Sequence, residues 1–164
     1  MLYRKEDFMA DFDDRLFLAP MTGEVLDLAE CVDPIFAQAI VGAGVLLVPS
    51  DSKVYAPCAG KVSIVAQGRH GIAIKNPAGF QVLIHIGIDT VEMDGDGFKI
   101  FKKVGDDVLP GDLLLEFDLD KIKSSGRNIQ SPIVITNPNI KKVEKLATGV
   151  VKSGDEIFRI GEGL

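Results

Sequence analysis

The chain has 164 residues, of which 46% are hydrophobic and 26% are charged, and this composition is typical of a single globular domain. Its 24 acidic and 18 basic side chains give a formal net charge of −6 without any block rich in Lys or Arg, which argues against nucleic-acid binding. The longest uncharged run, residues 34–50, is too short for a spanning helix and contains Gly42, Gly44 and Pro49, so no stable membrane insertion is expected.

The N-terminal residues mix acidic and basic side chains and show no apolar segment of the kind found in secretory signals. Cys31 and Cys58 stand alone, without CxxC spacing, which favours free thiols in a reducing compartment. A cytoplasmic protein is therefore predicted. Residues 1–14 are expected to form a flexible leader, followed by one domain over residues 15–164.

Two short motifs each occur twice. The pattern Ala-Pro-x-x-Gly-x-Val covers residues 19–25 and 56–62, and Val-x-x-Gly-Asp covers residues 108–112 and 151–155. In the first motif, Pro at a strand edge and Gly in a turn would switch the chain from one sheet to another. Short strands with frequent Gly and Pro turns predict an all-β fold, an antiparallel β-sandwich or barrel with internally repeated hairpin motifs.

One or two short helices are expected within this fold. Asp33 and Pro34 read as an N-cap and a first-turn proline, and Gly42 ends that helix early. Asp118 would cap a second helix over residues 119–125, which Gly126 ends. Residues 94–103 are predicted to form a surface loop. Strands are predicted over residues 45–48, 61–66, 72–75, 80–88, 113–117, 133–136 and 157–160.

The predicted strand over residues 80–88 contains one of the two histidines, His85. Alternation places residues 82, 84, 86 and 88 on one face and residues 83, 85, 87 and 89 on the other. The turn at residues 75–79 lies halfway between His70 and His85. A hairpin centred between Asn76 and Gly79 would place the two histidines opposite each other, with both imidazoles on one face.

Paired imidazoles can act as nucleophile and supporting donor, as acid and base, or as two metal ligands. A zinc site would need a third ligand, and Asp89 is the nearest candidate in sequence. The chain has no GxSxG, HExxH or CxxC motif and no phosphate-binding loop with Lys-Ser/Thr. These residues alone leave the three chemistries open.

Further motifs extend along most of the chain. They are Ala19-Pro20-x-x-Gly23-Glu24, Asp33-Pro34-Ile35-Phe36-Ala37, Val41-Gly42-x-Gly44, Tyr55-Ala56-Pro57-x-x-Gly60, His85-Ile86-Gly87-Ile88-Asp89-Thr90-Val91, Gly95-x-Gly97-Phe98, Gly111-Asp112, Glu116-Phe117-Asp118-Leu119 and Ser131-Pro132-Ile133-Val134-Ile135-Thr136-Asn137. In this order and spacing, the chain resembles the glucose-class enzyme IIA domain (EIIA type 1) of the bacterial phosphoenolpyruvate-dependent sugar phosphotransferase system. The resemblance covers about residues 16–160.

The resemblance implies a phosphocarrier, a phosphotransferase component with a phosphohistidine intermediate. His85 would accept a phosphoryl group through Nε2 from the phosphohistidine of HPr and pass it to a cysteine of a IIB domain for sugar uptake. His70 would donate a hydrogen bond to the phosphoryl oxygens, and a backbone carbonyl, that of Gly87, would hold the Nδ1 proton of His85. No cofactor would be required, and any zinc at His70 and His85 would be adventitious or regulatory.

The resemblance also implies a docking surface for HPr and the IIB domain. Its apolar members would be Ile35, Phe36, Ile40, Val41 and Leu83, and its acids Asp33 and Asp89 would face arginines of HPr and steer association. Each apolar residue taken singly could equally belong to the core. The sugar is not determined, because its specificity resides in the membrane IIC component, and the chain could be free-standing or part of a larger permease.

The chain departs from the family pattern beside the first histidine. Many members read Thr-x-His-Ala there, whereas this chain reads Gly68-Arg69-His70-Gly71. The missing hydroxyl removes an orienting contact to His70, and Arg69 adds a cation that would bind the phosphoryl group or be a solvated loop residue.

Two other functions are consistent with parts of the sequence. A regulatory IIA-like protein would bind transporters or kinases according to its phosphorylation state, through the same surface. A zinc-dependent hydrolase on a similar β architecture would need a further ligand such as His-x-His, but Ile86 and Gly87 follow His85.

Overall fold

A computed structural model describes residues 13–161 of the chain. The leader predicted for residues 1–14 therefore lies outside the described residues except at Asp13 and Asp14. Almost all regular structure in the described range is β, as predicted, and every strand pair is antiparallel.

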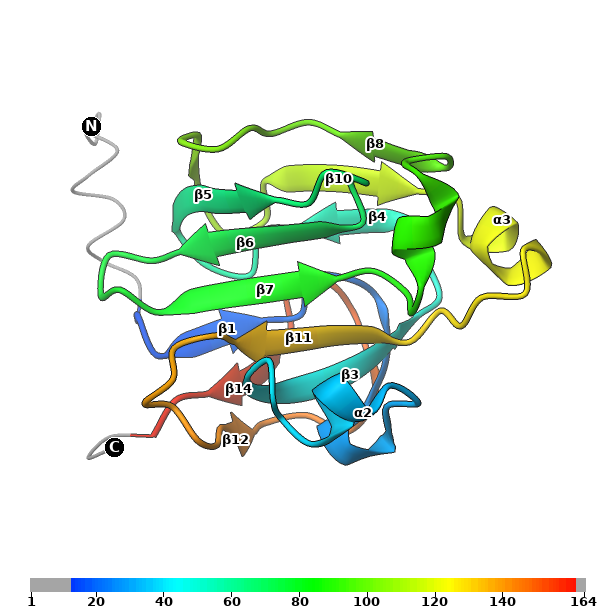
Figure 1. The fold of residues 1–164 in the computed structure, drawn as a ribbon. Coiled ribbons are helices and arrows are strands. Elements are labelled where there is room, and N and C mark those ends of the chain that lie inside the picture. The colour runs from blue at the N-terminus through cyan, green and yellow to red at the C-terminus, as the bar shows by residue number, and fades with distance from the viewer. Residues whose placement is uncertain (1–12, 162–164) are drawn as a thin grey trace.

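The largest sheet forms one layer of the fold (Figure 1). Its eight strands follow the order β13 (Gly149–Val151), β2 (Gly23–Asp27), β3 (Ala43–Pro49), β11 (Ser131–Ile135), β7 (Gln81–His85), β6 (Gly71–Lys75), β5 (Gly60–Val65) and β9 (Asp107–Val108). Both ends of this order are open edges, so within the described residues the sheet does not close into a barrel.

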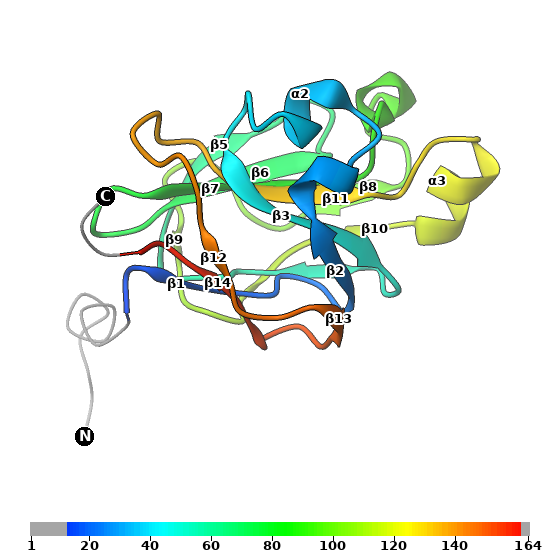
Figure 2. The same cartoon turned by 90° about the horizontal axis from the view of Figure 1, so that it is seen from below.

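Two three-stranded sheets complete the sandwich. One contains β1 (Leu16–Leu18), β14 (Glu156–Arg159) and β12 (Glu144–Lys145), and the other contains β4 (Lys53–Tyr55), β10 (Leu113–Phe117) and β8 (Phe98–Ile100). Figure 2 shows β1, β14 and β10 on one side of the large sheet and α2 on the other. Alternate residues of the large sheet point inward to a shared core that includes Val45, Ile72, Ile84 and Ile133.

The repeated Ala-Pro motif joins these layers in the way the sequence predicts. Its first copy leads from β1 in one small sheet to β2 in the large sheet, and its second leads from β4 in the other small sheet to β5. The glycines are not in turns, however. Gly23 and Gly60 begin strands, where a Cβ would lie 2.2 Å and 2.3 Å from a carbonyl oxygen of the neighbouring strand. They are required by close backbone approach.

The repeated Val-x-x-Gly-Asp motif forms matching turns that bind the Ala-Pro segments. Gly111 and Gly154 have positive φ angles of 88° and 94°. The backbone N–H of Ala56 donates to Asp112 O, and that of Ala19 donates to Asp155 O. Each Ala-Pro copy is therefore held by one Gly-Asp turn.

Both predicted helices form. α2 (Pro34–Ala37) starts where the Asp33 side chain accepts from Ile35 N, and α3 (Leu119–Ser124) starts where the Asp118 side chain accepts from Lys121 N. α2 ends well before Gly42. Two 3-10 helices, η1 (Leu28–Glu30) and η2 (Thr90–Met93), were not predicted.

The prediction of a loop over residues 94–103 is wrong in its middle. There β8 pairs with β10, and Phe98 packs into the core. One large apolar residue among glycines carries too little periodicity to mark a three-residue strand.

No helix within residues 13–161 is both long and apolar enough to span a membrane.

Candidate functional site

The β6–β7 hairpin carries both histidines, but its register differs from the prediction by one residue. The strands pair Gly71 with His85 and Lys75 with Gln81, so His70 is not opposite His85. Asn76 N donates to Phe80 O, and Gly79 has a φ of 88°, so the connection is a three-residue loop, residues 77–79, within the predicted turn at residues 75–79.

The two imidazoles nevertheless meet, because His70 lies just before β6. Arg69 adopts a left-handed conformation with φ of 63°, and its N–H donates to Ala66 O in the preceding turn. This bend brings the His70 ring to a centroid distance of 5.1 Å from the His85 ring, at an interplanar angle of 78°. The predicted pair is therefore present, placed by a turn and not by strand alternation.

His85 ends β7 on the outer face of the large sheet. Its Nδ1 lies 2.8 Å from the carbonyl oxygen of Gly87, so this nitrogen carries the ring proton and donates it there. The Phe36 ring packs at 5.1 Å, centroid to centroid. With Nδ1 protonated, the neutral imidazole has its free electron pair on Nε2.

The segment after His85 leaves the strand at Gly87. Gly87 has a φ of 72°, and a Cβ there would lie 2.5 Å from Thr90 Cγ2. The predicted strand therefore ends three residues early. Ile86 packs in the main core and Ile88 packs in a second cluster with Phe36, so the prediction that they share one face is wrong.

His70 is the less solvent-exposed of the two histidines, at 8% exposure. Its Nδ1 is buried and no described residue gives it a hydrogen bond of good geometry, although the backbone of Gly68 lies beside it. A Cβ on Gly68 would lie 2.8 Å from this nitrogen. The absence of a side chain at position 68 thus leaves room for the ring and leaves Nδ1 without a side-chain partner.

Burial keeps both imidazoles neutral. It lowers the pKa of His85 to about 4, assisted by the neighbouring His70, while Gly87 and the acids Asp33 and Asp89 raise that pKa to a smaller extent. Burial also lowers the pKa of His70. At neutral pH the site therefore presents two uncharged imidazoles.

The lowered pKa of His85 predicts a pH-dependent stability. An unfolded histidine binds a proton below about pH 6.5, whereas the folded His85 does so only near pH 4, so the unfolded state binds more protons between these values. We expect the free energy of unfolding to fall by up to about 3 kcal/mol as the pH drops from 6.5 to 4. Urea unfolding at stepped pH measures it. His85→Gln should flatten the slope, and an unchanged slope in that variant would contradict the assignment.

Three of the residues predicted to dock a partner lie close to His85: Phe36 packs on its ring, and Asp33 and Asp89 are near enough to raise its pKa. Ile35 and Ile40 are 51% and 68% exposed, whereas Phe36 is 7% exposed and supports the His85 ring. Val41 and Leu83 are half-buried and pack against the second cluster. Asp33 is half-buried and Asp89 is exposed.

Sequence reasoning missed two further exposed apolar residues, Val32 and Val91, each 59% exposed. Val32 precedes α2, and the Val91 backbone lies near Gly68. Neither residue stands out in the sequence, because an isolated valine gives no sign of its exposure.

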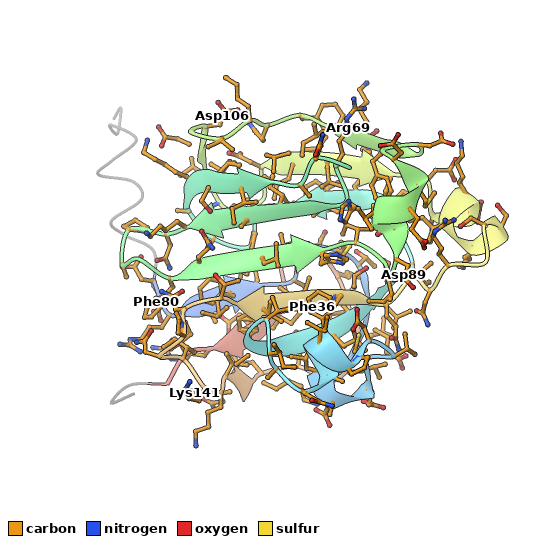
Figure 3. The ribbon with its side chains drawn as sticks, in the orientation of Figure 1. Phe36, Arg69, Phe80, Asp89, Asp106 and Lys141 are labelled. Atoms are coloured by element: carbon orange, nitrogen blue, oxygen red, sulfur yellow. The ribbon has the colours of Figure 1, made fainter. Side chains whose placement is uncertain are left out.

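Arg69 is exposed and its Nε lies 4.0 Å from where a Cβ on Gly95 would be. In Figure 3 it lies toward β8, on the far side of β6 from Phe36, whereas Asp89 lies beyond the end of β7.

A metal centre finds no support in the described part of the chain. Within residues 13–161, no three His, Cys, Asp or Glu side chains come close enough together to hold a metal ion. Asp89 therefore does not complete a three-ligand site with the two histidines.

Comparison with known proteins identifies the family. Residues 15–140 match the family model for the phosphoenolpyruvate-dependent sugar phosphotransferase system, EIIA 1. The chain is also similar to the solved structure of glucose permease IIA from Mycoplasma capricolum, at 34% identity and a TM-score of 0.84, with 89% of this chain and 95% of that chain covered. The sandwich, the paired histidines and these two matches agree, and the chain belongs to the EIIA type 1, glucose-class family of the sugar phosphotransferase system.

Proposed function

We propose that this EIIA domain carries a phosphoryl group on Nε2 of His85, accepting it from phospho-HPr and passing it to a cysteine of a IIB domain. The observation that carries the proposal is the 2.8 Å contact between His85 Nδ1 and Gly87 O. This contact directs the free electron pair of the imidazole to Nε2, the nitrogen available for in-line attack.

Phosphoryl transfer from HPr to His85 requires no proton to leave the site. The Nε2 electron pair forms the new N–P bond, and the pair of the breaking N–P bond stays on the donor nitrogen of HPr. The Nδ1 proton remains between His85 and Gly87, so the ring becomes an imidazolium beside the phosphoryl dianion. In the second transfer a cysteine thiolate of the IIB domain attacks phosphorus, and the N–P electron pair returns to Nε2.

His70 would act as a supporting donor. Its Nδ1 is enclosed, which makes Nε2 the ring nitrogen that can reach a phosphoryl oxygen. The two rings are close enough for one phosphoryl group to contact both, at 5.1 Å between centroids. Phe36 and the second apolar cluster limit access of water to the labile N–P bond.

The direct test is incubation of the wild-type chain with phosphoenolpyruvate, enzyme I and HPr, followed by intact mass before and after mild acid. We expect the mass of one phosphoryl group, lost in acid. Transfer to a IIB domain added afterwards tests the second step. An unmodified mass under conditions that phosphorylate HPr would overturn the proposal.

The exposed isoleucines predict where HPr binds. A carboxylate at position 40 would be desolvated in an apolar contact, so Ile40→Asp should raise the KM for phospho-HPr about tenfold with little change in kcat. Val150→Asp is the matched control, because Val150 is 84% exposed on β13, at the sheet edge remote from β7. Steady-state transfer kinetics distinguish the two variants, and equal KM values would place the docking surface elsewhere.

Two further roles remain predictions: a phosphate contact from Arg69, and binding of transporters or kinases by the unphosphorylated form. The cytoplasmic location also remains a prediction. The first role requires slower transfer from HPr in Arg69→Ala. The second role requires capture of a defined transporter or kinase that is lost on phosphorylation of His85.

A further inference from the structure

Two buried hydroxyls, those of Ser131 and Thr90, form hydrogen bonds to the peptide group that precedes Gly87. We propose that they are positioning residues for His85, which hold its ring in the tautomer that bears the proton on Nδ1. The consequence for phosphoryl transfer rests on the proposed function, whereas the effect on the tautomer does not.

The peptide between Ile86 and Gly87 is held at both ends. Its N–H, from Gly87, donates to Ser131 Oγ at 3.2 Å, and its carbonyl, from Ile86, accepts from Thr90 Oγ1 at 2.5 Å. Ser131 and Thr90 are both fully buried, at 0% exposure. Both hydroxyls are therefore shielded from bulk water.

Ser131 is oriented by a second hydrogen bond. Its hydroxyl donates to Ile129 O at 2.9 Å, so its lone pairs face the N–H of Gly87. The hydroxyl is required because the backbone ladder between β7 and β11 covers only residues 82–84 and 133–135. Beyond it, the left-handed Gly87 turns away from the strand and its buried N–H needs another acceptor.

The next peptide, between Gly87 and Ile88, presents the carbonyl that accepts from His85 Nδ1. Its N–H donates to Asn128 O at 2.9 Å. Glycine has wide freedom in φ and ψ. The Gly87 carbonyl is therefore directed at His85 Nδ1 only if hydrogen bonds fix the peptide on each side of Gly87. The Asn128 carbonyl holds the following peptide, and Ser131 and Thr90 hold the preceding one.

Loss of either hydroxyl should therefore loosen the Gly87 carbonyl and release the Nδ1 proton. A neutral ring that populates the Nε2–H tautomer has its electron pair on Nδ1, facing the protein, and cannot attack phosphorus. A misplacement of a reacting group by about 1 Å can slow a reaction by up to about a hundredfold.

The test is ¹⁵N NMR of the two ring nitrogens of His85 at neutral pH, which distinguishes the tautomers without any phosphoryl donor. The wild type should show Nδ1–H alone. Thr90→Val, which removes the hydroxyl and keeps the shape, and Ser131→Ala should each populate Nε2–H and slow phosphoryl acceptance about tenfold. Thr90→Ser, which keeps the hydroxyl, should retain the Nδ1–H tautomer.

Ser125→Ala is the control, because the Ser125 hydroxyl donates to Ile122 O beside α3 and does not touch Gly87. An unchanged His85 tautomer in both Thr90→Val and Ser131→Ala would overturn the proposal. If these variants do not fold, a wild-type ring found as Nε2–H overturns it, and Nδ1–H in wild type and Thr90→Ser supports it. A wild type with the expected tautomer that takes no phosphate from HPr would refute the proposed function alone.

Discussion

His85→Gln is expected to lose phosphoryl acceptance from HPr by more than about 1,000-fold, because an amide side chain has no nucleophilic nitrogen. Glutamine keeps a polar side chain of similar reach, so the loss should not come from unfolding. The substitution also removes a buried imidazole whose pKa is lowered, so the variant should be at least as stable as the wild type at low pH. Intact mass and circular dichroism on the same sample measure the two effects.

His70→Gln is the matched comparison for this variant. Since His70 would stabilise the phosphoryl group and not bond to it, His70→Gln should still acquire an acid-labile phosphoryl group, at a reduced rate. Full labelling of His85→Gln would contradict the role of His85 as the acceptor. If His70→Gln then acquired no phosphoryl group at all, the two roles would be exchanged.

Gly87→Ala should lower both the free energy of unfolding and the rate of phosphoryl transfer from HPr. A Cβ at this position would lie 2.5 Å from Thr90 Cγ2 and 3.1 Å from Asn128 O, and φ of 72° is unfavourable for any side chain. The left-handed backbone costs about 1–2 kcal/mol and overpacking about 1–3 kcal/mol, so we expect a loss of about 2–5 kcal/mol in the free energy of unfolding. Relief of the clash would also move the carbonyl that accepts from His85 Nδ1.

Gly79→Ala separates the backbone cost from the packing cost. Gly79 has a φ of 88°, yet nothing lies within 4 Å of a Cβ there. This variant should lose only about 1–2 kcal/mol and transfer phosphate normally. Urea unfolding and HPr-dependent labelling of both variants test the comparison, and equal losses would show that packing at Gly87 contributes nothing.

Local chemistry made several elements predictable. Both helix starts could be predicted from a few neighbouring residues, Asp33 with Pro34 in one case and Asp118 in the other. In each, the aspartate side-chain oxygen accepts from a free backbone N–H group of the first turn. The repeated Ala-Pro motif likewise predicts where the chain changes sheets. Short strands such as β8 were missed, since three residues paired to a distant segment show no readable pattern.

The site was predicted in its members but not in its geometry. Sequence indicated that His70 and His85 meet, yet the alternation argument assumed a register one residue away from that of the structure. The rings meet because Arg69 turns the chain before β6, and a left-handed conformation in a residue other than glycine has no clear sequence signal.

The sequence by itself determined the family, the all-β class and the two histidines, because motifs of fixed spacing and alternating apolar residues are local properties. The tertiary structure alone decided which atoms meet: Nδ1 of His85 with the Gly87 carbonyl, Gly68 with Nδ1 of His70, and Ser131 with Gly87. Ser131 lies 44 positions from Gly87 in the sequence. Contacts of this kind depend on how β11 packs beside β7, and burial within that packing lowers the pKa of His85 to about 4.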